Sequence, residues 1–101
     1  MVQGTTPTFI LTLPSTVDLS IADHVTFSLT QGRVSIKKKE EELTIDHNTV
    51  NVYLTQAETL RFAANIDAEL QLNWTYDNGS RACSEIKSVN VGRNLLKEVM
   101  E

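Results

Sequence analysis

Residues 68–76 alternate apolar and polar side chains without a break. Successive side chains on a β-strand point to opposite faces, so this pattern gives one apolar face and one polar face. The apolar face is formed by Ala68, Leu70, Leu72, Trp74 and Tyr76. A helix would spread these side chains around its circumference. The segment therefore predicts a half-buried antiparallel strand, followed by a turn at residues 77–80.

The rest of the chain repeats this pattern in shorter stretches separated by turn residues. We expect about seven strands at roughly ten-residue spacing. Such spacing predicts an all-β fold, a two-sheet antiparallel sandwich that is immunoglobulin-like by strand number, with a small barrel as the alternative. No repeat, linker or low-complexity stretch divides the 101 residues. We therefore interpret residues 1–101 as a single domain.

Three local patterns refine this expectation. The mixed-charge run at residues 37–42 is typical of a solvated hairpin end or strand edge, with a binding patch as the alternative. Thr55 and Glu58 have capping-box spacing, which predicts a helical turn at about residues 56–61. The strand at 81–91 changes the parity of its apolar residues, which predicts a β-bulge near residues 87–88.

The last nine residues suggest a short C-terminal helix, for which Asn94 would be the N-cap. Four apolar side chains then recur at helical spacing. They are Leu95, Leu96, Val99 and Met100. Such a stripe serves either as a lid over the sandwich or as a contact for a partner chain, so these residues are our candidate partner contacts.

Composition limits the classes of partner. The net charge of −4 argues against nucleic-acid binding, which needs a basic face. No apolar run approaches the ~20 residues of a membrane-spanning helix, so we expect no membrane partner. Cys83 is the only cysteine, so no intrachain disulfide can form. The sequence also begins without the pattern of a signal peptide, and we expect a protein made in the cytosol.

The residues that could carry out chemistry are few and scattered. We interpret His24 and His47 as solvated side chains at a strand end and in a turn, and Cys83 as a small buried thiol. Two histidines and one cysteine do not make a zinc site, and the aspartates lack calcium-loop spacing. No phosphate-binding or dinucleotide-binding loop occurs. We therefore predict no catalytic residue, no metal and no cofactor.

One pair of aromatic side chains suggests a different function. Trp74 and Tyr76 lie near the end of their strand, close in sequence to Asn73, Asn78 and Arg81. An exposed aromatic ring with polar neighbours is typical of carbohydrate-binding sites. Trp74, Tyr76 and Asn78 are therefore candidate glycan contacts. The alternative interpretation is that both rings cap the core.

Four segments resemble a family of small proteins encoded in the tail-gene regions of phages and prophages of low-GC Gram-positive bacteria. These segments are residues 4–7, 25–31, 54–62 and 79–86. The most specific is Leu-Thr-Gln-x-x-Thr-Leu-x-Phe, which begins at Leu54. The order of elements is also similar to that of the amino-terminal domain of phage baseplate upper proteins, which is an immunoglobulin-like sandwich.

The resemblance implies a non-catalytic structural protein of a phage tail or baseplate. Such a protein would be made in the bacterial cytoplasm and become a virion component on assembly. Its partners would be other phage structural proteins and further copies of itself. No catalytic residue belongs to the family pattern, so the resemblance transfers none to this chain.

Overall fold

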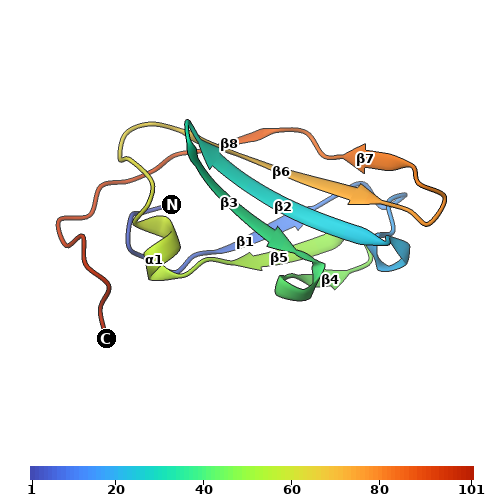
Figure 1. Ribbon diagram of the computed structural model, residues 1–101, viewed down its shortest axis with the longest axis horizontal. Coiled ribbons are helices and arrows are strands. Elements are labelled where there is room, and N and C mark those ends of the chain that lie inside the picture. Colours follow the sequence, from blue (N-terminus) through green and yellow to red (C-terminus); the bar gives the residue numbers. More distant parts are fainter.

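The computed structural model describes residues 1–101 and has two antiparallel β-sheets that pack face to face (Figure 1). The small sheet has the strand order β1 (Thr8–Thr12), β5 (Thr49–Tyr53) and β4 (Thr44–Asp46). The large sheet has the order β3 (Val34–Lys39), β2 (His24–Gln31), β6 (Ala68–Thr75) and β7 (Arg81–Cys83), and β8 (Lys87–Val89) also pairs with β6. Two 3₁₀ turns and one short helix complete the fold: η1 (Leu19–Ile21), η2 (Glu40–Glu42) and α1 (Gln56–Thr59).

The mainly-β, two-sheet antiparallel architecture predicted from the sequence is confirmed. The strands number eight where about seven were expected. Both sheets are open, as in a sandwich, so the alternative of a barrel is wrong. The capping box is confirmed, because the Thr55 hydroxyl accepts from the Glu58 amide at 3.2 Å and the Glu58 carboxylate accepts from the Thr55 amide at 2.9 Å.

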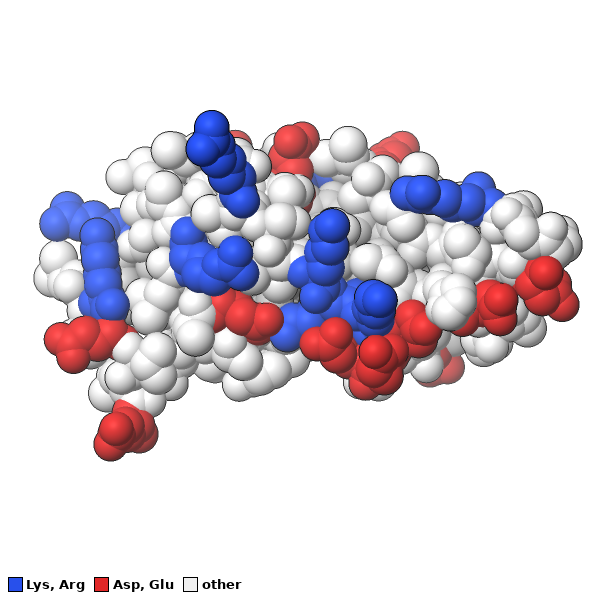
Figure 2. Space-filling model, viewed as in Figure 1, with Lys and Arg blue, Asp and Glu red and all other residues white.

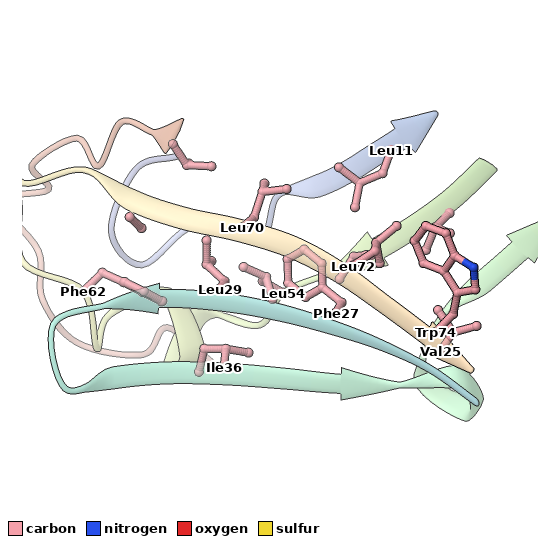
Figure 3. Close-up of a cluster of buried hydrophobic side chains, with 14 of the residues drawn as sticks. Leu11, Val25, Phe27, Leu29, Ile36, Leu54, Phe62, Leu70, Leu72 and Trp74 are labelled. Carbon is pink, nitrogen blue, oxygen red and sulfur yellow. The ribbon is translucent and has the colours of Figure 1, made fainter. Parts of the chain in front are cut away.

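The core is built from alternate side chains of the facing strands (Figure 3). In β2 and β6 every second residue is buried, including Phe27 and Leu72. Phe9 of β1 lies over Phe27 of β2, with the ring centroids 6.2 Å apart. This aromatic contact joins the two sheets, so the period-two pattern of the sequence becomes a single apolar layer between them.

The phase change in the last strand corresponds to a shift in register. Cys83 pairs with Asn73 of β6, whereas Lys87 pairs with Leu70, so the strand carries one residue more than its partner. The extra residue lies between β7 and β8, at 84–86, a little before the predicted position. Ser84 holds this bulge in place, because its hydroxyl accepts from the Leu72 amide and its own amide donates to the Leu72 carbonyl, both at 2.9 Å.

The predicted C-terminal helix is wrong, because residues 93–101 contain no helix. The Asn94 side-chain oxygen accepts from the Leu96 amide at 3.1 Å, as an N-cap would, but no helix follows, and its side-chain nitrogen donates to the Gln3 carbonyl at 2.9 Å. The Gln56 side chain holds the end of the segment, accepting from the Met100 amide at 2.7 Å and donating to its carbonyl at 3.2 Å. So short a helix is unstable alone in water, and the apolar side chains of this segment remain exposed, so tertiary packing does not stabilise one here.

We predict that Phe27→Ala lowers the free energy of unfolding by about 3–5 kcal/mol, because it leaves a cavity at the contact between the sheets. Urea denaturation followed by circular dichroism measures this loss. Ile21→Ala is the matched control, since Ile21 is 69% exposed and its truncation should change stability by about 0.5 kcal/mol or less. Equal effects of the two substitutions would contradict the assigned core.

Candidate functional site

The two long sides of the sandwich differ in how they are closed. On the side of β3, Lys38 points inward and only 8% of it is exposed. Its ammonium group lies 2.8 Å from the Glu58 carboxylate and 3.9 Å from that of Glu42. Burial raises the pKa of Glu58, but the hydrogen bonds from Lys38 and Thr55 and the charge of Lys38 together outweigh this effect, so the pKa lies below its usual value. A charged pair therefore closes this side and discourages another strand from pairing there.

The opposite side, between β1 and the β7–β8 strand, is open. A hollow of about 410 Å³ lies there between the two sheets. Most of its lining is apolar and comes from the end of β1, the following loop, β6 and the β7–β8 bulge. The lining residues are Leu11, Thr12, Leu13, Pro14, Val17, Leu70, Leu72, Trp74, Cys83, Ser84, Glu85 and Lys87. We call this hollow the open groove.

The β1 strand that borders the open groove has a free edge. The Pro7 carbonyl accepts a hydrogen bond from the Leu54 amide at 3.1 Å, and the Leu13 amide donates one to the Asn48 carbonyl at 2.8 Å. Both backbone groups of a residue in an antiparallel strand point to the same side, so the odd-numbered residues of β1 bond to β5. The backbone groups of Thr8, Ile10 and Thr12 therefore point away from the sheet, and all three residues are exposed.

The predicted partner contacts lie elsewhere. Leu95, Leu96, Val99 and Met100 are 87%, 45%, 55% and 65% exposed. They occupy the extended C-terminal segment, near α1 and at the end of the molecule where both termini lie (Figure 1). The structure does not bring them to the open groove. They form no lid over the sandwich, and their use as contacts for another chain stays a prediction.

Of the predicted glycan contacts, Trp74 lines a second concavity, on the outer face of the large sheet, whereas Tyr76 and Asn78 do not. This polar trough has a volume of about 320 Å³. Its lining residues are His24, Thr26, Ser28, Lys37, Asn73, Trp74, Thr75 and Arg81. Only 5% of Trp74 is exposed, and its indole donates to the Tyr76 hydroxyl at 3.1 Å. Asn78 is exposed, but its side-chain oxygen accepts from the Ser80 amide at 2.9 Å within the turn.

Two charged groups at the polar trough are fixed by hydrogen bonds. Arg81 donates to the Asn73 side-chain oxygen at 3.0 Å, which holds the guanidinium over the sheet. The ring of His24 lies 3.0 Å from the Glu40 carboxylate. This hydrogen bond lowers the pKa of Glu40 to about 2 and raises the pKa of His24. On the face that includes β2 and β3, basic side chains spread over the surface and acidic ones gather along the rim near β4 (Figure 2).

The residues considered for catalysis are not brought together. His47 contacts the Asp18 carboxylate at 3.3 Å and the Ser15 carbonyl at 3.0 Å. Neither histidine forms a hydrogen bond with a serine hydroxyl or with Cys83. Cys83 is exposed at the rim of the open groove, so its interpretation as a buried thiol is wrong. No three His, Cys, Asp or Glu side chains cluster closely enough to hold a metal ion.

Sequence reasoning missed the open groove and the free edge of β1. Val17 comes from a stretch without clear periodicity, and the meeting of Leu13, Pro14 and Val17 with the β7–β8 bulge depends on long-range pairing. One signal was available, because no side chain before Asp18 is charged. A long uncharged stretch that contains an edge strand is unusual, since edge strands commonly carry charge.

Comparisons of the chain with protein-family models, with curated protein sequences and with solved structures found no match. No helix in the structure has both the length and the apolar character needed to cross a membrane. The structural evidence that bears on function is therefore the geometry of the open groove, the edge of β1 and the polar trough.

We predict a pH dependence from the pair of His24 and Glu40. The stabilisation needs both charges, because the pKa of His24 is raised from 6.5 and that of Glu40 is lowered from 4.5. It should be greatest between these two values, fade as the pH rises through the folded-state pKa of His24, and fade as the pH falls toward about 2. Thermal melts of the wild type and Glu40→Gln across this range measure the difference.

Glu41→Gln is the matched control for this experiment, because Glu41 is exposed and forms no salt bridge. Its melting temperature should follow that of the wild type at every pH. A constant offset between Glu40→Gln and the wild type from pH 3 to 9 would contradict the assigned pair.

Proposed function

We propose that this chain is a non-catalytic structural module of a phage or prophage tail or baseplate, with an immunoglobulin-like sandwich that acts through protein–protein contacts. One structural observation carries the contact part of the proposal: an apolar groove and an unpaired strand edge lie together on one side of the sandwich. The tail or baseplate setting is supported by the resemblance of residues 4–7, 25–31, 54–62 and 79–86 to phage tail-region proteins.

The chemistry of the open groove fits a protein ligand. Apolar lining gains free energy when water leaves it, at about 25 cal/mol for each Å² of apolar surface buried. Unpaired backbone groups at a strand edge bind another strand, as in β-augmentation. Glu85 and Lys87 are the only charged side chains in the lining, so the groove offers few fixed charges for a small polar substrate.

A test of this proposal uses particles from the bacterium that encodes the chain. After prophage induction, the chain should sediment with density-purified phage particles and be detected there by mass spectrometry. Deletion of its gene should leave particles with incomplete tails, visible by electron microscopy. Complementation with Leu13→Asp, which places a charge in the open groove, should restore the protein but fewer than about a tenth of the complete tails.

Complementation with Ile66→Asp is the control, because Ile66 is 56% exposed and does not line the groove. Circular dichroism of both purified variants checks that each is folded. Absence of the chain from purified particles, together with normal tails after gene deletion, would overturn the proposed function.

The polar trough favours a second candidate function, a module that binds host cell-surface carbohydrate. Threonine and serine hydroxyls, the Asn73 amide and the Arg81 guanidinium all face this concavity, and such groups bind sugar hydroxyls. The burial of Trp74 removes the flat aromatic platform that the sequence suggested, so recognition would depend on these polar groups.

NMR titration with purified cell-wall polysaccharide fragments tests the second candidate. Binding should shift the amide signals of Thr26, Asn73 and Thr75, and Arg81→Ala should weaken the affinity by about tenfold. Arg61→Ala is the control, because Arg61 is exposed and lies outside the trough. Signals that do not move at millimolar fragment concentrations would exclude the carbohydrate function.

A further inference from the structure

Four strands lie at the edges of the two sheets, and three of them are protected against pairing with another chain. The edge of β3 ends in Lys37, Lys38 and Lys39. β4 has three residues and ends in Asp46. The β7–β8 edge is interrupted by its bulge. Charge, shortness and bulges are the usual devices that prevent edge-to-edge pairing.

β1 has none of these devices. It is five residues long, with the sequence Thr-Phe-Ile-Leu-Thr, and it contains no charge, no proline and no bulge. Ile10, at its centre, is 68% exposed. The outward backbone groups of Thr8, Ile10 and Thr12 have no partner strand. An exposed, regular, apolar edge of this kind is a template for a further strand.

We propose that β1 pairs antiparallel with β1 of a second copy of this chain, about a two-fold axis at Ile10. This inference rests on the proposed function, because it names the first partner of the assembly module. The pairing joins the two small sheets into one continuous sheet. Ile10 then lies opposite the partner's Ile10, and Thr8 lies opposite the partner's Thr12.

The sequence of β1 favours a second copy over another occupant. A two-fold axis places each residue against its counterpart, so any charge near the axis would meet a like charge. No side chain before Asp18 is charged, so the β1–β1 pairing itself contains no such repulsion. The strand is also nearly palindromic, with threonine at both ends and isoleucine at the centre. Its two ends therefore present the same side chains to each other.

The open groove supplies the remaining contact area. A stable interface buries roughly 1,200–2,000 Å² in total, which is more than two five-residue strands can cover. Antiparallel pairing of β1 places the open sides of the two copies next to each other. The half-buried groove residues Leu13 and Val17 then lose contact with water in both copies. The strand edge sets the register, and the groove adds apolar burial.

Disulfide trapping tests the register. In a Cys83→Ser background, Ile10→Cys should cross-link two copies, because residues directly opposite in a hydrogen-bonded antiparallel pair have Cα atoms about 5.5 Å apart. Tyr53→Cys is the matched control: Tyr53 is 55% exposed, pairs with Thr8, and lies one strand further from the axis. Under mild oxidation, Ile10→Cys should form dimer at least about ten times faster than Tyr53→Cys. Equal rates would overturn the proposed register.

Sedimentation equilibrium tests the dimer without cross-linking. The wild type should show twice the 11.3 kDa mass of the chain. Ile10→Lys should weaken the dimer by about tenfold or more, because two lysines meet at the axis, whereas Ile10→Thr should keep it. Ile10→Pro should give a folded monomer, because the outward amide of Ile10 is not used within the sheet and proline is tolerated at such an edge.

A wild type that stays monomeric at millimolar concentration would overturn the β1 dimer. The proposed function would survive that result if the chain is still found in phage particles. If the predicted cross-link forms but the chain is absent from phage particles, the β1 dimer would stand and the proposed function would be overturned. The two proposals can therefore fail separately.

Discussion

The contact between the inner faces of the two sheets is the constraint on which the rest of the structure depends. The chain has a single cysteine and therefore no intrachain disulfide, so apolar packing between the sheets must hold the domain together. Phe27 is fully buried and meets Phe9 across the layer. A core one layer thick cannot also cover every edge of two open sheets. Side chains close the space between the sheets along one side of the sandwich and leave it open along the other. The open side is therefore the surface that is available to partners.

The two long sides of the sandwich resolve this problem in opposite ways. On the β3 side, Lys38 occupies a position whose side chain points inward, and the Glu58 carboxylate pairs with its ammonium group. The same Glu58 completes the capping box of α1, so a single carboxylate fixes the helix and closes the edge. On the β1 side, the ladder of β6 is interrupted at 84–86, and Ser84 and Glu85 of this bulge line the open groove. No charged pair closes this side as Lys38 and Glu58 close the other.

Local patterns predicted most of the fold but little of the site. The alternation of β6 and the capping box at Thr55 depend on neighbours in sequence, and both are confirmed. The parity change also revealed the bulge, because an extra residue shifts every later side chain to the opposite face. The C-terminal helix failed because helical spacing alone does not supply a surface to pack against. The open groove was not predictable, since residues as distant as Leu13 and Cys83 meet there only through strand pairing.

The distribution of edge protection also limits what an assembly of this chain can be. An unprotected edge normally risks open-ended aggregation, because each added strand exposes a new edge. Here the small sheet has one unprotected edge, β1, while its other edge is the short β4, which ends in Asp46. Pairing about a two-fold axis uses both free β1 edges and leaves two protected β4 edges outside. The contact therefore closes on itself and stops at two copies, whereas a head-to-tail contact between β1 and β4 would continue into a fibre.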